Sequence, residues 1–302
     1  MTDNGKKAFR CGFVAIVGRP NVGKSTLLNA LIGEKVSIVT PKPQTTRHRI
    51  LGIDTRPMHQ AVFVDTPGFH RSQPRAINRA MNRTAMGSIS EADVVLLVVE
   101  ALRWTGEDQD VLDRCAESGL PLLVAVNKVD TVKPMTRLLP FLESVAAKAE
   151  IQEVIPLSAT RGTSLERLRD AVFARLPEGP ALFPGEMSSD KDERFRIAEI
   201  IREKLMLRLH QELPYGLTVG VDELERDSRL MRISAVVWVE RSGQKAIVIG
   251  QGGSQLKACG QAAREEIEHI WGVKVHLQLW VKVRKRWTDS ERALRDLGID
   301  LQ

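Results

Sequence analysis

The chain has 302 residues, of which 43% are hydrophobic and 27% are charged, and its 44 Lys and Arg against 38 Asp and Glu give a net charge of +6. This composition is typical of a globular protein and excludes a collagen, a coiled coil and a wholly disordered chain. Because single hydrophobic cores stop growing at about 250–300 residues, the length predicts two domains.

The three cysteines, Cys11, Cys115 and Cys259, lie far apart and have no metal-ligand spacing, which is typical of free thiols in a reducing cytosol. No segment approaches about 18 consecutive apolar residues, and the amino-terminal residues lack the apolar core of a signal peptide. We therefore expect a cytoplasmic protein without a transmembrane segment.

The excess positive charge is concentrated in two blocks. Residues 1–50 carry nine basic and two acidic residues, residues 241–286 carry nine and three, and the rest of the chain is net acidic. Clustered basic residues favour polyanionic partners, so the two blocks indicate two separate sites for such a partner.

Five apolar runs of strand length alternate with helical stretches between residue 12 and about residue 176. They are GFVAIVG (12–18), AVFVD (61–65), DVVLLVVE (93–100), PLLVAVN (121–127) and EVIPLS (153–158). Runs rich in Val, Ile and Leu are typical of strands covered on both faces, and their alternation with helices predicts a mostly parallel sheet. We assign residues 1–178 to this α/β domain.

The following stretch, residues 177–190, has three prolines and two glycines in fourteen residues and no periodicity, so it predicts a linker that acts as a hinge. Beyond it we expect an α+β domain in the order helix, strand, strand, helix, helix, strand. Its expected elements are an amphipathic helix over 192–211, a hairpin that turns at 225–229, the strand-like apolar run AIVIG (246–250), a helix over 255–270 and a strand over 273–283. We assign residues 179–191 to the linker and residues 192–302 to the second domain and its tail.

The sequence GRPNVGKS (18–25) fits the pattern G-x-x-x-x-G-K-[ST] between a buried strand and a helix, which predicts a phosphate-binding P-loop. The glycines allow successive backbone N–H groups to face the β-phosphate, Lys24 can neutralise the β- and γ-oxygens, and the Ser25 hydroxyl can bind Mg²⁺. The residues expected to contact the nucleotide are Gly18, Asn21, Val22, Gly23, Lys24, Ser25 and Thr26.

The sequence NKVD (127–130) follows the fourth apolar run and favours guanine. Asp130 can accept hydrogen bonds from N1–H and the 2-amino group of guanine, and a site of this kind rejects an analogue without those donors by roughly 10⁴–10⁵. The Lys128 stem would lie on the base plane. Asn127 would either face the other base edge or tie this loop to the P-loop. Ser158 and Ala159, after the last run, would present a backbone N–H to the guanine carbonyl.

The sequence DTPG (65–68) ends the AVFVD run and fits a nucleotide-dependent switch. Asp65 would reach Mg²⁺ through water, and the N–H of Gly68 would contact the γ-phosphate. Hydrolysis removes that contact and releases the following segment.

These motifs, in this order, resemble the Ras-like GTPase superfamily and its translation-factor-related (TRAFAC) class. The stretch PKPQTTRHR (41–49) resembles the first switch of the TrmE-Era-EngA-like subgroup. The resemblance implies that Thr46 coordinates Mg²⁺, with Thr45 as the alternative, and that Lys24, Thr46 and Gly68 act on the γ-phosphate in hydrolysis.

The residue after DTPG is Phe69, whereas Ras-type enzymes place there a Gln that orients the attacking water. We therefore expect slow intrinsic hydrolysis that a partner accelerates. The subgroup resemblance adds the hypothesis that Asn21, with backbone of the first switch, holds a potassium ion.

Gly250, Gln251, Gly252 and Gly253 match the GXXG loop of KH domains, which clamps about four nucleotides of single-stranded RNA. With the element order, this loop and its flanks VERSGQKAIVIG and LWVKVRKRW resemble the type II KH domain of the Era family. The basic residues expected to contact phosphates are Lys245, Lys257, Arg264, Lys282 and Arg284. We expect Trp271 and Trp280 in the core.

The resemblance covers residues 12 to about 287. It implies a GTP- and GDP-binding, Mg²⁺-dependent switch that binds 16S rRNA near its 3′ end and acts in biogenesis of the 30S ribosomal subunit. It also implies a monomer that can attach peripherally to the inner face of the cell membrane. Two other readings remain open: a GTPase acting on another RNA target, and an RNA-binding scaffold with a vestigial nucleotide site.

Overall fold

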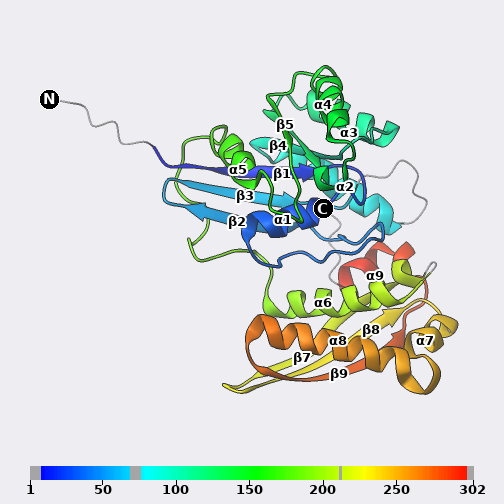
Figure 1. The fold of residues 1–302 in the computed structure, drawn as a ribbon. Helices are drawn as coiled ribbons and strands as arrows, with labels where there is room; N and C mark the ends of the chain where they lie inside the picture. The colour runs from blue at the N-terminus through cyan, green and yellow to red at the C-terminus, as the bar shows by residue number, and fades with distance from the viewer. Residues whose placement is uncertain (1–7, 69–75, 211–212, 298–302) are drawn as a thin grey trace.

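The computed structural model describes residues 8–68, 76–210 and 213–297, which form two stacked α/β domains (Figure 1). Among these residues, no helix has the length and apolar character that a membrane span requires. The mixed α/β architecture, with a mostly parallel sheet in the first domain, confirms the predicted fold class.

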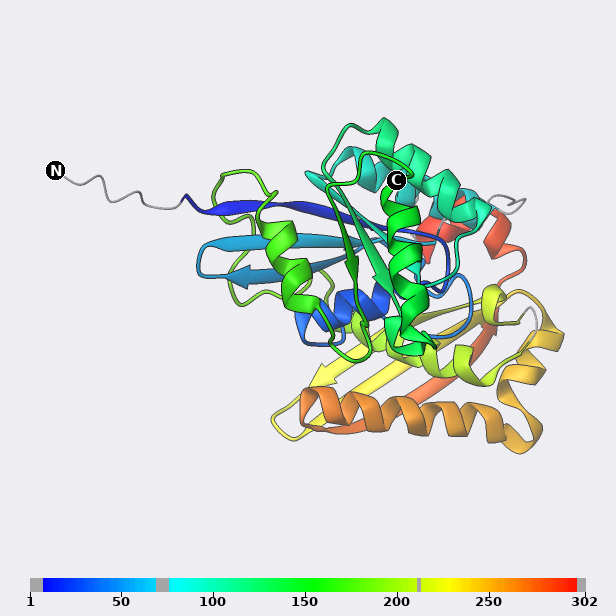
Figure 2. The ribbon, with the colours of Figure 1, turned by 45° about the horizontal axis from the view of Figure 1, so that its top comes forward.

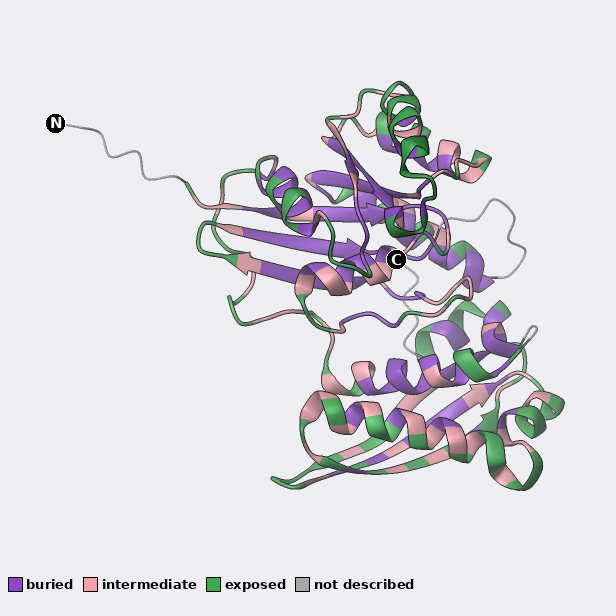
Figure 3. Cartoon of the chain, viewed as in Figure 1, coloured by how far each residue is buried: buried purple, intermediate pink, exposed green. Residues whose placement is uncertain are grey.

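The first domain is a six-stranded sheet in the order β2-β3-β1-β4-β5-β6, and β2 is its one antiparallel strand. Its strands are β1 (Arg10–Val17), β2 (Ile50–Arg56), β3 (His59–Asp65), β4 (Val94–Glu100), β5 (Leu122–Asn127) and β6 (Glu153–Pro156). Figure 3 shows these strands buried along most of their length. The carboxyl ends of the parallel strands share one edge, where binding sites of open α/β sheets lie.

Helices cover both faces of this sheet. One core packs α1 (Lys24–Ile32) and α5 (Leu165–Phe173) against the strands, and the other packs α2 (Ala76–Ser90), α3 (Gly106–Glu117) and α4 (Leu138–Ala146) against the opposite face. The five predicted strands are present, but the sequence analysis missed β2. Its polar residues Asp54, Thr55 and Arg56 interrupt the apolar run, and its antiparallel pairing with β3 removes the need for a crossover helix.

The linker is held on the first domain instead of spanning freely between domains. The side-chain oxygen of Gln60 accepts hydrogen bonds from the N–H groups of Leu182 (2.8 Å) and Phe183 (3.0 Å), and the N–H of Ile53 donates to the carbonyl of Ser188 (2.9 Å). Phe183 also packs on the apolar face of β2 and β3. The hinge expected over residues 177–190 is therefore limited to the few residues before α6.

The second domain packs helices on one face of a three-stranded sheet in the order β7-β8-β9, with β8 and β9 parallel. Its elements are α6 (Glu193–Arg208), β7 (Leu217–Arg226), β8 (Leu230–Val239), α7 (Ser242–Ile249), α8 (Ser254–Trp271) and β9 (Lys274–Val283), followed by a 3-10 helix (Trp287–Asp289) and α9 (Glu291–Asp296). The AIVIG run belongs to α7, so its strand-like composition was misleading.

The expected burial of the tryptophans was partly wrong. Trp280 is 57% exposed, and Trp271 is only half-buried. The reason is that β9 alternates between the helix-covered face of the sheet and its uncovered face, and Trp280 falls on the uncovered one. Trp287, beyond the strand, is fully buried.

The domains meet at two places. Helix α6 lies between the two sheets and faces the segment that follows α1, and α9 lies beside α2 (Figures 1 and 2). At the second place, Trp287, Ala293 and Leu294 form a small apolar cluster with Ile77 and Met81 of α2. Both meeting places involve segments of the first domain that flank its predicted switches.

Candidate functional site

The predicted P-loop leaves β1 and ends at α1, and its glycines adopt conformations that other residues rarely reach. Gly18 has φ 146° and Gly23 has φ 100°. A Cβ on Gly23 would lie 2.4 Å from the Nδ2 atom of Asn127, so only glycine fits there. The loop lines a pocket of about 390 Å³ together with residues 38–46, Gly68 and Lys128.

The ammonium group of Lys24 lies inside this loop. Its Nζ donates to the carbonyls of Gly18 (2.9 Å) and Arg19 (3.1 Å), and the side chain is only 7% exposed. Burial lowers the pKa of Lys24 to about 8, an effect that the nearby Asp65 carboxylate opposes. A buried cation with only carbonyl partners is well prepared to bind phosphate oxygens.

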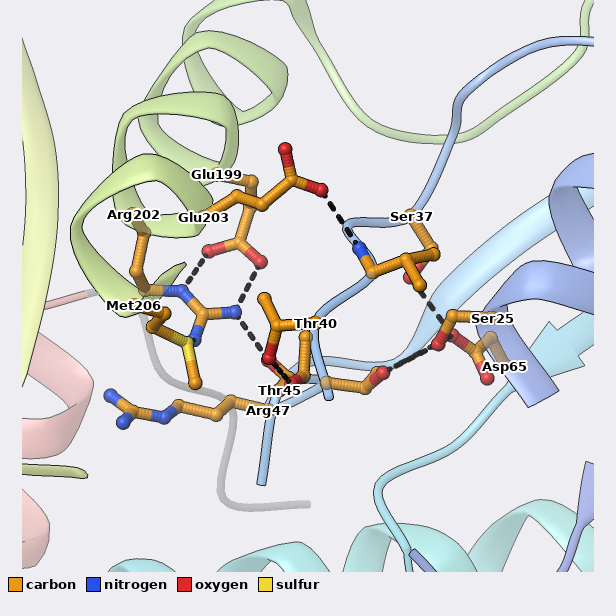
Figure 4. A network of polar contacts seen from close by, with 12 residues as sticks. Ser25, Ser37, Thr40, Thr45, Arg47, Asp65, Glu199, Arg202, Glu203 and Met206 are labelled. Carbon is orange, nitrogen blue, oxygen red and sulfur yellow. Dashed lines mark hydrogen bonds and ion pairs between the residues drawn. The ribbon is translucent and has the colours of Figure 1, made fainter. Parts of the chain in front are cut away.

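Ser25, Thr46 and Asp65 bring their oxygens together beside the pocket, and Figure 4 shows Ser25 and Asp65 side by side. The Oγ of Ser25 lies 2.7 Å from Oδ2 of Asp65 and 2.8 Å from Oγ1 of Thr46, which in turn lies 3.4 Å from Oδ2 of Asp65. Thr45 instead bonds within its own loop, to the carbonyl of Lys42 (2.7 Å) and the hydroxyl of Thr40 (2.6 Å).

This oxygen cluster fits a magnesium ion. Mg²⁺ prefers oxygen ligands from few carboxylates, completed by waters and substrate phosphates. The Oδ1 atom of Asp65 is buried without a hydrogen-bond partner, and burial raises the pKa of this carboxyl group against the opposing effect of the Ser25 hydroxyl. A cation at the cluster would satisfy the unpaired oxygen and the buried charge.

The expected guanine-binding residues lie on the neighbouring loops. Asn127 ties these loops together, since its Nδ2 donates to the carbonyl of Val22 (2.9 Å) and its Oδ1 accepts from the N–H groups of Lys128 (2.8 Å) and Ala159 (3.0 Å). Of the two roles expected for Asn127, these contacts fit the one in which it ties its own loop to the P-loop. Asp130 is exposed beside it, free to meet a base.

The N–H groups of Ser158 and Ala159 are both engaged within the protein, with the carbonyl of Thr163 and with Asn127. The direct contact to a guanine carbonyl expected of this pair is therefore not preformed. Lys128 has φ 66° and its Nζ lies 3.0 Å from the carboxylate of Glu100, at the rim of the pocket.

The remaining predicted residues of this pocket are also close by. A Cβ on Gly68 would lie 2.8 Å from Pro20, so the backbone of the DTPG motif lies against the P-loop. Val22 is buried, and Thr26 lines the pocket. The Nδ2 of Asn21 donates to the carbonyl of Pro41 (3.0 Å) in the first switch. Phe69 lies outside the described residues.

Three residues that support this pocket were missed by the sequence analysis. Ser37 donates to Oδ2 of Asp65 (2.9 Å), and Asn29 accepts from the N–H of Ser37 (2.9 Å), so α1 holds the start of the first switch. Arg19 binds Asp108 (3.1 Å) and Glu100 (2.7 Å). Ser37 and Asn29 lie outside the motifs and Arg19 occupies a variable position of the P-loop pattern, so only their partners in space reveal them.

The predicted GXXG loop joins α7 to α8 and is exposed. Gly250 (φ 74°), Gly252 (φ 58°) and Gly253 (φ 79°) all have positive φ, and Gly253 is the N-cap of α8. The N–H groups of Gly250 and Gly253 donate to the carbonyls of Ala246 (2.9 Å) and Gly250 (3.1 Å), and the missing side chains allow a ligand to approach the backbone closely. A groove of about 460 Å³ continues from Gly253 along α8 and β9, lined by Lys257, Arg264, Leu277 and Leu279 among others.

The other predicted RNA contacts are not all in this groove. Lys245 is exposed on α7, near the loop. Lys282 lies on the uncovered face of the sheet, opposite Trp238 of β8, and Arg284 forms an ion pair with Asp296 (2.6 Å). The structure therefore separates Lys282 from Lys257 and Arg264, because alternate residues of β9 face opposite sides of the sheet.

We extend the name first switch from the predicted residues 41–49 to the whole segment 34–49, which is bound to the second domain through α6 (Figure 4). Glu203 accepts from the N–H of Val39 (2.9 Å) and from Nζ of Lys35 (2.6 Å), and Arg202 donates to the carbonyl of Thr45 (2.5 Å). Lys42 donates to the carbonyls of Met206 and Leu209.

Arg47 extends this interface. It is only 2% exposed, and its guanidinium donates to the carbonyls of Pro214 (2.9 Å), Tyr215 (3.1 Å) and Leu217 (2.6 Å). Burial lowers its pKa to about 9, with Arg202 acting in the same direction. Lys35, Lys42 and Arg47 thus contact the second domain, whereas Arg49 pairs with Glu91 of the first domain.

Comparisons with known proteins cover both domains. Residues 13–128 match the family model described as 50S ribosome-binding GTPase, and residues 212–288 match that of the KH domain. The chain is 50% identical over 298 residues to the GTPase Era of Pseudomonas aeruginosa, covering 99% of this chain and 98% of the relative. It is 50% identical over 290 residues to the GTPase Era of Stenotrophomonas maltophilia, covering 96% and 97%.

Two solved structures are similar over the same length. A variant of Era from Aquifex aeolicus bound to GDP and AlF₄⁻ superposes with a TM-score of 0.92 at 37% identity, covering 96% of this chain and 99% of that one. Era in complex with MgGDPNP and nucleotides 1506–1542 of 16S rRNA gives a TM-score of 0.92 at 38% identity, with the same coverage. This chain therefore belongs to the Era family of GTPases.

Proposed function

We propose that this GTPase is a nucleotide-dependent switch that binds 16S rRNA near its 3′ end and acts in assembly of the 30S ribosomal subunit. Two features support the proposal: the similarity to an Era structure that holds nucleotides 1506–1542 of that RNA, and the basic groove beside the GXXG loop. The contact between the first switch and α6 supports the proposal that the bound nucleotide controls RNA binding.

In the nucleotide site, each residue has a separate role. Lys24 neutralises the β- and γ-phosphate oxygens, and the backbone N–H groups of the P-loop hold the β-phosphate. Ser25, Thr46 and Asp65 would hold Mg²⁺, which supplies charge neutralisation on the phosphates. The N–H of Gly68 meets the γ-phosphate, and Asp130 selects guanine.

Hydrolysis in this site depends on positioning. The described pocket residues include no carboxylate or imidazole free to act as a base, since Asp65 bonds Ser25 and Ser37. The residue after Gly68 is Phe69, which cannot orient a water. We infer slow intrinsic turnover that a partner raises by completing the water's environment.

The potassium hypothesis follows from the position of Asn21 beside the first switch. Its Nδ2 donates to the carbonyl of Pro41 (3.0 Å), so the side chain reaches the switch backbone, and a monovalent cation would replace this hydrogen bond to bind the amide oxygen and the switch carbonyls. Hydrolysis measured in K⁺ and in Na⁺ at constant ionic strength tests this; equal rates would remove the hypothesis.

The coupling of nucleotide to RNA follows from the interface. The segment that carries Thr46 toward the γ-phosphate also carries Val39 and Thr45, whose backbone groups bond Glu203 and Arg202 of α6. A change in the switch on loss of the γ-phosphate must therefore change what α6 contacts. By linkage, RNA bound to the KH domain alters nucleotide affinity in return.

Fluorescence anisotropy with a labelled oligonucleotide of the 16S rRNA 3′ end tests the proposal, with the protein bound to GDPNP or GDP. We expect tighter binding in one nucleotide state and phosphate release from GTP that the oligonucleotide changes. Equal affinities would refute the coupling, no hydrolysis would favour a scaffold with a vestigial site, and preference for an unrelated RNA would favour another target.

Two further properties remain part of the proposal. We propose that the chain acts as a monomer on the 30S subunit, as the family resemblance implies. We also propose peripheral attachment to the inner face of the cell membrane through basic surface residues, which anionic lipid attracts. Sedimentation and flotation with anionic vesicles test these properties.

A further inference from the structure

The uncovered face of the KH sheet carries an exposed tryptophan. The inward residues of β8 and β9 pack under α6 and α8, whereas Trp280 points away from these helices and is 57% exposed. Among the large hydrophobic side chains exposed in the described part of the chain, it is the one aromatic. Tryptophans are enriched at interfaces, so an exposed one favours a bound partner at this face.

A cationic group and a second tryptophan lie next to it. Trp280 is paired with Val236 across the β8–β9 ladder, and Lys282 is paired with Trp238, with its Nζ 5.6 Å from the ring centre of that tryptophan. We call Trp238, Trp280 and Lys282 the tryptophan corner. Just beyond it, Lys285 and Arg286 are exposed.

Glu223 and Glu225 of β7 lie on the same face of the sheet but away from this corner, paired with Ser234 and Arg232 at the hairpin end of the strands. The hairpin end therefore carries both signs of charge, since Lys274 also lies there, whereas the corner places Lys282 beside aromatic rings. Aromatic rings beside lysines suit single-stranded RNA, because bases stack on the rings and phosphates bind the cations.

The corner also lies directly behind the proposed RNA groove. Leu277 and Leu279 of β9 line that groove, whereas the residues between and after them, Gln278 and Trp280, face the other side of the same strand. In the sheet order β9 is the last strand, and no described strand pairs with its outer edge. A nucleic acid that leaves the groove across the outer edge of β9 would next contact the tryptophan corner.

We propose that RNA bound in the GXXG groove wraps around the edge of β9 and stacks further bases on Trp280, with Lys282 binding a phosphate. The inference rests on the proposed RNA-binding function and extends its footprint from one face of the sheet to both. It commits to the continuing strand of the same RNA as occupant, because the corner adjoins the groove and is cationic.

Single-stranded RNAs of two lengths distinguish binding in the groove from binding at the tryptophan corner. A labelled oligonucleotide of about four nucleotides fills only a GXXG groove, whereas one of about twelve can also reach the corner. Anisotropy is measured on the full chain bound to GDPNP. We expect Trp280→Ala to weaken binding of the long RNA by about five-fold or more and to leave the short RNA unchanged, with Trp280→Phe restoring most of the loss.

The lysine is tested with a matched control. Lys282 and Lys274 lie on the same face of β9 at opposite ends of the strand, and both are exposed. We expect Lys282→Ala to lower the salt dependence of long-RNA binding by about 0.7 in log–log slope, the amount for one lost phosphate contact. Lys274→Ala should leave the slope unchanged.

The outcomes distinguish the inference from the function on which it rests. If neither RNA binds the wild-type protein, the proposed function fails as well. If both RNAs bind but Trp280→Ala affects neither, or affects both equally, only the wrapped path is refuted. Loss of flotation with phosphatidylglycerol vesicles in Trp280→Ala, with unchanged RNA binding, would assign the corner to membranes and also overturn the inference.

Discussion

Thr45 and Thr46 are adjacent and identical in type, yet they have different partners. Thr46 meets Ser25 and Asp65, whereas Thr45 bonds Thr40 and Lys42 within the loop. We expect Thr46→Ala to slow GTP hydrolysis by about ten-fold or more and to raise the Mg²⁺ concentration required, because one oxygen of the proposed metal site is lost. A Mg²⁺ titration of phosphate release measures both effects.

Thr45→Ala is the control for that substitution. Its side chain holds only the loop, and the carbonyl that Arg202 binds remains. We expect hydrolysis to stay within about three-fold of wild type. If Thr45→Ala has the larger effect on Mg²⁺ dependence, the assignment of the metal ligand to Thr46 is wrong.

Glu199 is a buried acid in the interface whose carboxylate bonds the guanidinium of Arg202 at 2.7 and 2.6 Å. Burial alone would raise its pKa, but Arg202, with His48 and Arg47, lowers the pKa below the usual value. A lowered folded-state pKa contributes stability that is present above the pKa of unfolded Glu and lost as the pH falls through the folded value.

Replacing this acid should therefore have a pH-dependent effect. We expect Glu199→Gln to cost about 3–5 kcal/mol of unfolding free energy at neutral pH, because Arg202 is left buried without its countercharge. The difference from wild type should shrink below about pH 4. Urea unfolding at several pH values measures this, and a difference independent of pH would contradict the assigned charge state.

The single residues that could be predicted from the sequence are those of the motifs, because a motif is defined by local spacing. The P-loop, DTPG and NKVD motifs each contribute residues to one pocket, among them Lys24, Gly68 and Lys128, because each motif lies at the end of a parallel strand. Ser37, Glu199 and Arg202 could not be predicted. Their importance comes from partners up to 157 residues away, as in the bond from Arg202 to Thr45, and no local pattern encodes such pairs.

Among the elements of the second domain, the turn between α7 and α8 requires glycine at one position. Gly250 has φ 74° and ψ 172°, and a Cβ there would lie 3.0 Å from the backbone nitrogen of Gln255. We expect Gly250→Ala to destabilise the protein by about 1–3 kcal/mol and to weaken RNA binding, because the loop must shift. Denaturant unfolding and anisotropy give the two values.

Gly243 provides the comparison within the same pair of helices. It lies in α7, and a Cβ there would meet nothing within 4 Å. Gly243→Ala should raise stability by about 0.5–1 kcal/mol, as expected for a helical glycine, and leave RNA affinity unchanged. If both substitutions have the same effect on stability, the backbone of Gly250 is not under the constraint described here.

The elements that the sequence analysis misread share a physical cause. From local composition, β2 was missed, Trp280 was expected in the core and the linker was expected to be a hinge, but each depends on where the chain packs. β2 exists because β3 pairs with it, Trp280 is exposed because no helix covers that face, and the linker is fixed because Gln60, buried in β3, binds its backbone. Apolar periodicity does not report on any of these conditions.

At the scale of the whole molecule, the KH domain contacts both segments that flank the γ-phosphate position. α6 bonds the first switch, and the segment from Trp287 through α9 packs on α2, the helix that follows DTPG in the chain. The two contacts belong to different parts of the KH domain. α6 is a helix of its core, whereas α9 follows β9 in the chain. Movement of either switch would therefore shift the same RNA-binding domain.

A substitution of Glu203 tests whether α6 couples the first switch to the KH domain. Its carboxylate binds the N–H of Val39 and the ammonium of Lys35, and Lys35 also binds Glu266 of α8, the helix that lines the RNA groove. Allosteric coupling of this kind typically amounts to about 1–3 kcal/mol, or roughly 5- to 150-fold in affinity. We expect Glu203→Ala to bring the ratio of RNA affinities in the GDPNP and GDP states several-fold closer to one.

The matched control is Glu193→Ala, at the other end of α6, whose carboxylate pairs with Arg226 within the KH domain (2.9 Å) and should leave the ratio unchanged. Thermodynamic reciprocity supplies a second measurement, because RNA must change the affinity for GDPNP relative to GDP by the same factor as the nucleotide changes the affinity for RNA. Both ratios should fall together in Glu203→Ala. If RNA affinity falls equally in the two nucleotide states, Glu203 supports the fold of the KH domain and does not transmit the state of the switch.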